Sequence, residues 1–340
     1  MTAAARVVLL VTSPRVAPGL LSADAWDALR AGPVYVADAD LPVVEVMRSA
    51  GVAVQIAGTD RRVSDVAVEV VDAAHREGTA TWWLGPDRDE DMVRAVTLVI
   101  DGRRPQESVD IEIMDGSWDV PGARLLDVVA TMDRLRSPGG CPWDVAQDHA
   151  SLAPYLLEEA YEAFQAIEDA DLRALRDELG DVLLQIAFHA RLAEELPADE
   201  RWSIDDVATG LVDKLVRRHP HVFDGLDVRD ADEVNANWDA IKAAERGGGS
   251  PLAHVPLASP ALTLAATLQR KAARAGASDI GAQSLAAAAS DFYSAPTAET
   301  AGELLWAAVA AIRDADVDAE AALRARARQF RDDYLDRPNG

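Results

Sequence analysis

Hydrophobic and polar positions alternate in short blocks over residues 1–115. Short apolar runs predict strands at 6–11, 33–37, 52–57, 80–84 and 96–100. Amphipathic segments between them predict helices at 23–30, 43–49 and 63–76. Strands that alternate with helices are typical of an α/β region with a mostly parallel sheet. Residues 101–124, with their prolines and glycines, predict a connector.

This first region carries no nucleotide or cofactor fingerprint. Its glycines mark turns and do not assemble a GxGxxG or P-loop pattern. Trp82 and Trp83 fall in a predicted strand, and we expect them in the core of the sheet rather than in a ligand-binding surface. The sequence therefore gives no function for this region.

After residue 124 the apolar spacing becomes helical. It predicts helices over 125–135, 151–167, 172–191, 203–218 and 230–246. Ser203, followed by Asp206, predicts a start that resembles a capping box. A tight loop over 137–144, with two prolines and two glycines, separates the first two of these helices.

Two of these helices carry carboxylates at their apolar faces. The first has Glu158, Glu159 and Glu162, and the second has Glu178 and Asp181. Glu159 falls inside the apolar stripe of its helix, with Glu162 at the edge and Glu158 beside it. Glu178 lies on the edge of the second stripe, and Asp181 lies just outside it.

A divalent cation is the simplest explanation of this placement. An unpaired carboxylate in an apolar environment is costly, and several carboxylates around one helix pair repel each other. A bound hard cation removes both problems, because carboxylate oxygen is the preferred ligand of Mg²⁺. The i,i+3 pairs Glu159/Glu162 and Glu178/Asp181 can each offer two ligands, and Gly180 suggests close approach of another group. The sequence therefore predicts a Mg²⁺ site, with Mn²⁺ as an alternative ion.

Composition narrows the choice of partners. The chain has 340 residues, of which 49% are hydrophobic, so we expect a globular protein of two or three domains. A net charge of −25 argues against nonspecific binding to nucleic acid or to an anionic membrane. The single cysteine, Cys141, cannot form an internal disulfide, and the six histidines show no zinc-ligand spacing. No apolar run is long enough for a signal peptide or a bilayer span, so we expect a cytoplasmic protein.

Several separated motifs resemble those of a known protein family. EEAYE, followed after fifteen residues by ELGD, resembles the MazG signature EExxE…ExxD. GCPWD (140–144), APYLLEE and DKLVRRHPHVF (213–223) extend the resemblance over residues 125–246. The resemblance implies an all-α four-helix-bundle domain that uses Mg²⁺ to split nucleoside triphosphates and deoxynucleoside triphosphates into monophosphate and pyrophosphate. It also implies a role in removing abnormal or surplus nucleotides, and assembly into a homodimer or higher homo-oligomer.

Residue roles follow from the motifs. Glu159, Glu162, Glu178 and Asp181 are the predicted metal ligands, and Glu158 is either a further ligand or orients a water molecule. The resemblance implies substrate contacts at Trp143, Asp144, Gln147, Asn235, Trp238 and Lys242, and the basic last turn of the helix 203–218 adds Lys214, Arg217 and Arg218 as phosphate-binding candidates. The cations near residue 218 either bind the triphosphate or complement the dipole of their helix. The two tryptophans either contact the nucleotide or pack in a core.

The predicted organisation is multidomain. An α/β region (1–115) has a weak resemblance to a shortened, inactive tetrapyrrole-methylase-like domain. The catalytic MazG domain (120–246) follows, and the Gly- and Pro-containing stretch 247–251 is a linker. Residues 252–336 are predicted to form a degenerate MazG-like helical repeat, in which Thr300 and Glu303 stand where Glu178 and Asp181 would fall.

Two other functions remain open at this stage. A di-iron carboxylate bundle would need Glu-x-x-His pairs, whereas Glu178 is followed by Asp181 at that spacing. A non-catalytic helical interaction protein is the second alternative, and the complete set of five acids argues against it.

Overall fold

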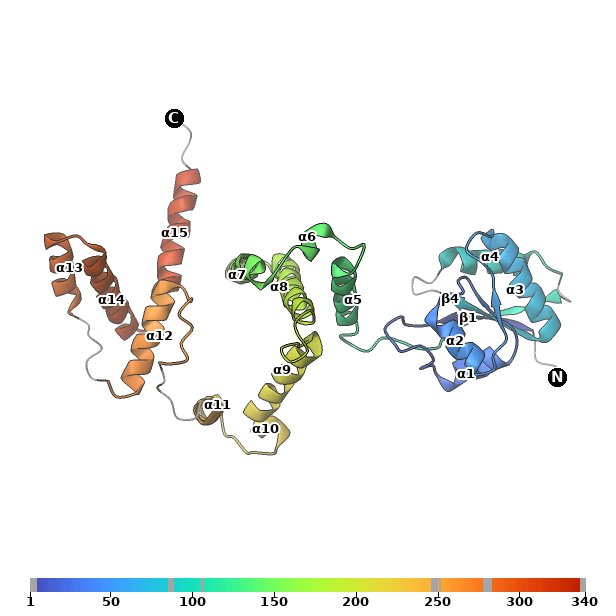
Figure 1. Cartoon of the computed structure of the whole chain (residues 1–340), viewed down its shortest axis with the longest axis horizontal. Coiled ribbons are helices and arrows are strands. Elements are labelled where there is room, and N and C mark those ends of the chain that lie inside the picture. Colours follow the sequence, from blue (N-terminus) through green and yellow to red (C-terminus); the bar gives the residue numbers. More distant parts are fainter. Residues whose placement is uncertain are drawn as a thin grey trace. The chain divides into compact units, whose positions relative to one another are not determined.

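The structure, a computed structural model, is shown in Figure 1. It describes residues 5–84, 89–104, 107–245, 250, 252–277 and 283–336. The chain divides into two compact units, Met1–Leu211 and Val212–Gly340, and each is described by itself. The predicted domain boundaries stay predictions, and the predicted linker 247–251 lies outside the described residues except for Ser250.

The first unit begins with a five-stranded sheet in the order β3-β2-β4-β1-β5. All its pairings are parallel. The strands are β1 (Arg6–Val11), β2 (Val34–Val36), β3 (Val54–Ile56), β4 (Thr79–Leu84) and β5 (Asp110–Asp115). Trp82 is 3% exposed in one core and Trp83 packs partly buried on the other, so the prediction that both lie in the sheet core is confirmed.

Helices cover both faces of this sheet (Figure 1). They are α1 (Ala23–Arg30), α2 (Pro42–Ser49), α3 (Val63–Glu77) and α4 (Glu90–Asp101). Successive side chains of a strand point to opposite faces, so Leu9 of β1 packs with α3 and α4, whereas Leu10 packs with α1 and α2. The predicted α/β architecture with a parallel sheet is confirmed.

The prediction of a strand at 96–100 is wrong. These residues belong to α4, where Met92 and Val96 lie one turn apart and are both buried on the sheet. The side chain of Asp89 accepts a hydrogen bond from the backbone nitrogen of Met92 and caps this helix. The fifth strand is β5, inside the segment predicted to be a connector.

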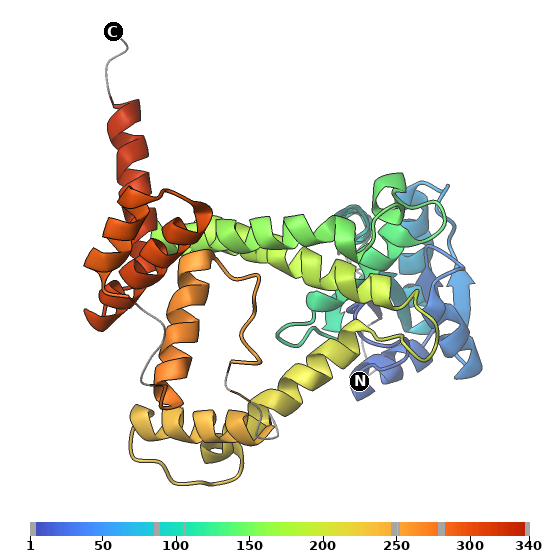
Figure 2. The same ribbon diagram turned by 60° about the vertical axis from the view of Figure 1, so that its left-hand side comes forward.

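The rest of the first unit is helical. It contains α5 (Leu125–Arg136), α6 (Pro142–Val145), α7 (His149–Glu168) and α8 (Leu172–Ala193). Helices α7 and α8 lie side by side as a hairpin (Figure 2), and α5 packs on α8 through Met132 and Phe188. A capping box starts α7, in which Asp148 accepts a hydrogen bond from the Ser151 nitrogen at 2.7 Å. The side chain of Asp171 caps α8.

Helix α9 (Ile204–Arg218) crosses the boundary between the units. The backbone nitrogen of Ser203 donates to Asp206 at 2.8 Å, which confirms the predicted capping at its start. The second unit contains α10 (Pro220–Phe223), α11 (Ala231–Glu245), α12 (Ala261–Arg274), α13 (Leu285–Ser294), α14 (Ala298–Asp314) and α15 (Ala319–Leu335). Among the described residues, no helix is long and apolar enough to cross a membrane.

Candidate metal centre

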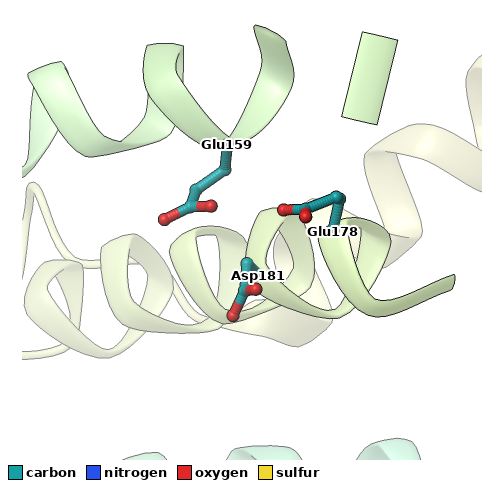
Figure 3. A group of neighbouring side chains, drawn as sticks. All are labelled: Glu159, Glu178 and Asp181. Carbon is teal, nitrogen blue, oxygen red and sulfur yellow. The ribbon is translucent and has the colours of Figure 1, made fainter. Parts of the chain in front are cut away.

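The predicted acids meet between α7 and α8. Carboxylate oxygens of Glu159, Glu178 and Asp181 lie within 4.8 Å of one another. Figure 3 shows Glu159 extending from α7 towards α8, which carries the other two side chains. Glu159 and Glu178 are half-buried and Asp181 is exposed, so the group is open to solvent on one side. Such a set of carboxylates within reach of one centre is suited to a hard divalent cation.

The electrostatics of this group favour a cation. Partial burial raises the pKa of Glu159, and the charges of Asp181, Glu162, Glu158 and Glu178 raise it further. Burial also raises the pKa of Glu178, together with the charge of Glu162 and a hydrogen bond to it. Burial first, and the neighbouring negative charges second, disfavour the ionised forms of both acids, and a bound cation would offset both effects.

The remaining two acids lie at the edge of the group. Glu162 reaches Glu178, as the hydrogen bond between them shows, whereas Glu158 is exposed and acts on Glu159 only through its charge. A Cβ atom added at Gly180 would meet no atom within 4 Å among the described residues. No part of the described chain therefore makes the close approach to Gly180 that the sequence suggested.

The loop between α5 and α7 carries three predicted substrate contacts. Trp143 is 52% exposed, which argues against a role in a core, and its ring meets the edge of Tyr155 on α7 with centroids 6.1 Å apart. The side chain of Gln147 donates to the Trp143 carbonyl at 3.0 Å and accepts from the Ser151 hydroxyl at 2.8 Å. The carbonyl of Asp144 accepts a hydrogen bond from Arg136, a buried residue that the sequence analysis did not single out.

The basic candidates belong to the second unit. Arg217 and Arg218 both pair with Glu245 of α11, at 2.7 Å and 2.5 Å, and hold the pKa of that carboxyl down at about 2. Lys214 is exposed, and the ammonium of Lys242 lies 4.4 Å from the centre of the Trp238 ring. The side chain of Asn235 lies outside the described residues. The roles of these residues in substrate binding stay predictions.

A cluster of two histidines and a tryptophan in the first unit was not predicted from the sequence. The Nδ1 atoms of His149 and His189 lie 2.8 Å apart, and Trp202 stacks on His149 with ring centroids 6.4 Å apart. Burial and the neighbouring His149 lower the pKa of His189. The two histidines are forty residues apart in sequence, so no local spacing could have indicated the pair.

The C-terminal helices α12, α13 and α14 pack together in the second unit. Helix α12 packs on α14, which pairs with α13, as α5 packs on α8, which pairs with α7. Thr300, which the predicted repeat aligns with Glu178, serves the capping box at the start of α14, where it exchanges hydrogen bonds with Thr297. The degenerate MazG-like repeat stays a prediction.

Comparisons with known proteins agree with the motifs. The chain matches the model of the MazG nucleotide pyrophosphohydrolase domain over residues 147–223. It is 48% identical over 225 residues to an uncharacterized 26.1 kDa protein of Streptomyces cacaoi. This alignment covers 66% of this chain and 86% of that protein. It is 47% identical over 159 residues to the nucleoside triphosphate pyrophosphohydrolase of Mycolicibacterium smegmatis, covering 46% of this chain and 48% of that protein.

The corresponding protein of Escherichia coli K12 is 43% identical over 157 residues, covering 45% of this chain and 57% of that protein. The chain thus spans about half the length of these two named relatives. The residues that match the domain model contain α7 and α8, and with them Glu159, Glu178 and Asp181. Domain match, signature motifs and extended identity agree, and the chain belongs to the MazG family.

Proposed function

We propose that this chain is a Mg²⁺-dependent nucleoside triphosphate pyrophosphohydrolase, which hydrolyses nucleoside triphosphates and their deoxy forms to monophosphate and pyrophosphate. The observation that carries the proposal is the meeting of Glu159, Glu178 and Asp181 between α7 and α8. The names of the relatives support the reaction. Removal of abnormal or surplus nucleotides is the physiological role that we propose.

The donor set fits the proposed ion. Three carboxylates from two facing helices supply hard oxygen donors, and the group contains no nitrogen or sulfur ligand. Glu162, which contacts Glu178, completes the proposed ligand set. Bound there, Mg²⁺ or Mn²⁺ would neutralise phosphate charge and polarise the phosphoanhydride. A di-iron site is less suitable, because histidine is absent from this group of described side chains.

The chain's own residues would bind and orient the nucleotide. Glu158, exposed beside the ligand set, either completes it or orients the attacking water. Lys214, Arg217, Arg218 and Lys242 would offset charge on the phosphates, because charge-assisted bonds from cations suit phosphate oxygens. Trp143, Asp144, Gln147, Asn235 and Trp238 are proposed base and sugar contacts, and the exposed ring of Trp143 supports its assignment.

We also propose that the helical hairpin pairs with a second copy of the chain. Large apolar side chains of α7 and α8 are exposed, among them Leu157 (55%), Ile167 (59%), Leu179 (52%) and Ile186 (40%). Large apolar side chains exposed on a helix pair are suited to an interface with another chain. For the degenerate C-terminal repeat we propose a role in packing or dimerisation, and for the α/β region no function is proposed.

The direct test is hydrolysis of a panel of nucleoside triphosphates in EDTA and in excess Mg²⁺. We expect activity only with the divalent ion, and its loss in Asp181→Asn. Asp177→Asn is the matched control, because it makes the same change on α8 outside the three-carboxylate group. Equal activity of both variants would contradict the assignment of the site.

A further inference from the structure

Arg136, the last residue of α5, is almost fully buried, with a side chain only 4% exposed. Its guanidinium binds both oxygens of Glu195, through Nε at 3.0 Å and Nη2 at 2.8 Å. The face of the group lies over the ring of Phe188, 5.5 Å from its centre. The two hydrogen bonds to Glu195 and the stacking on Phe188 hold the buried guanidinium in a single orientation. Its remaining N–H donor group, Nη1, therefore points in one fixed direction.

That direction is the loop between α5 and α7. Nη1 of Arg136 donates to the backbone carbonyl of Asp144 and, at 3.4 Å, to that of Gln147. One cation thus joins the end of α8, where Glu195 lies, to both ends of a four-residue segment of loop. Two other hydrogen bonds tie the loop to its neighbouring helices: the backbone nitrogen of Cys141 donates to the Leu135 carbonyl of α5 at 2.8 Å, and the Ser151 hydroxyl of α7 donates to the Gln147 side chain at 2.8 Å.

The same loop presents Trp143 to α7. The Trp143 ring meets Tyr155, and Tyr155 precedes Glu159 by one helical turn on the same side of α7. An exposed ring is therefore held one turn from a carboxylate of the proposed metal centre. A flat aromatic surface beside a triphosphate site is suited to a nucleobase.

We infer that Arg136 is a positioning residue, which fixes the loop 143–147 so that Trp143 stands against α7 and contacts the base or sugar of the bound nucleotide. The inference rests on the proposed function. Arg136 itself does not touch the substrate. Lysine cannot replace it, because an ammonium group lacks the planar fork that bonds Glu195 and the loop carbonyls at the same time.

The chain offers a matched control in Arg191 of α8. Its guanidinium also binds Glu195, at 3.0 Å, and binds Asp133 at 2.8 Å, but no hydrogen bond joins it to a loop carbonyl among the described residues. Arg136→Lys and Arg191→Lys therefore both weaken the contacts of Glu195, and only the first also releases the loop.

Steady-state kinetics provide the functional readout. We expect Arg136→Lys to raise the KM for the preferred nucleotide about tenfold, the size of one lost stacking contact, with kcat within about twofold. Arg191→Lys should leave KM near the wild-type value. In a Trp143→Ala background the effect of Arg136→Lys should shrink below about twofold, because both changes remove the same contact. Equal KM changes in the two lysine variants, or additive effects with Trp143→Ala, would overturn the inference.

Hydrogen exchange of the full-length protein separates this inference from the proposed function. Amides of residues 140–147 should exchange faster in Arg136→Lys than in Arg191→Lys, while α7 stays protected. Unchanged exchange in the loop would refute the anchoring even if no nucleotide were hydrolysed. If Arg136→Lys does not fold, Glu195→Gln weakens the same fork and should shift KM and loop exchange in the same direction. An active wild type with no such shift contradicts the inference alone, whereas an inactive wild type contradicts the proposed function.

Discussion

Replacing Glu159 by glutamine should make the metal-free protein more stable. The Glu159 carboxylate lies within 4.8 Å of Asp181, and two like charges at that distance repel by about 0.9 kcal/mol in a water-like dielectric. Glutamine has nearly the same shape and no charge. One kcal/mol corresponds to roughly 2–4 °C in Tm for a unit of this size. We therefore expect Glu159→Gln to raise the Tm in EDTA by roughly 2–4 °C at pH 7 and low salt.

The same substitution should remove the response to Mg²⁺. In the wild type, an ion at about 100 times its Kd adds about 2.7 kcal/mol of stability, or roughly 5–11 °C. Differential scanning calorimetry in EDTA and in MgCl₂ measures both effects. Glu200→Gln is the control, because it neutralises an exposed glutamate outside the group and should change neither. A lower Tm in EDTA together with a retained Mg²⁺ shift would refute this account of the repulsion.

The pH dependence has a definite sign. The folded-state pKa of Glu159 is raised above its unfolded value, so the folded protein binds more protons in the window just above pH 4.5. Metal-free stability contributed by this group is therefore present at low pH and is lost as the pH rises through its folded pKa. Mg²⁺ should remove this slope, because it binds the ionised form.

Three further predictions concern other surfaces. Leu157→Glu should shift the protein from dimer to monomer in sedimentation velocity, whereas Leu98→Glu, at a leucine of α4 that is also more than half exposed, should not. His189→Gln should flatten the loss of stability as the pH falls below 6.5, because burial lowers its folded pKa; His75→Gln, on the surface, should leave that loss unchanged. Glu245→Gln should lower the KM for nucleotides by up to about tenfold, since the carboxylate, with a pKa of about 2, occupies two candidate phosphate-binding arginines at any assay pH; an unchanged KM would contradict that role.

Local sequence patterns predicted most of the sheet, but they mistook part of a helix for a strand and a strand for part of a connector. Four of the five predicted strands are present, because short apolar runs between turn residues indicate the strands of such a sheet. Residues 96–100 are as apolar as a strand, but they belong to a helix. Its buried residues Met92 and Val96 lie four residues apart, which is the spacing of one helical face. Strand β5 was missed although its alternation of charged and apolar residues is a strand signal, because the prolines and glycines of residues 101–124 indicated a connector.

The acids of the site could be found from helical spacing, whereas the residues that pack around the site from distant parts of the sequence could not. Glu159 stood out because a charge interrupts an apolar stripe on a predicted helix. Arg136 gave no such signal, because an arginine in the last turn of a helix is ordinary on dipole grounds. Only the folded chain brings it to Glu195, fifty-nine residues away. The pairing of His149 with His189 depends in the same way on how α7 packs on α8.

The most direct test of the central claim is the identity of the products. Phosphorus NMR of a nucleoside triphosphate incubated with the full-length protein and Mg²⁺ separates pyrophosphate from orthophosphate. The account predicts monophosphate and pyrophosphate in equal amounts, with the rate lowered at least about 100-fold in Glu159→Gln and little changed in Glu200→Gln. Orthophosphate as the product, or pyrophosphate formed at the wild-type rate by Glu159→Gln, would contradict it.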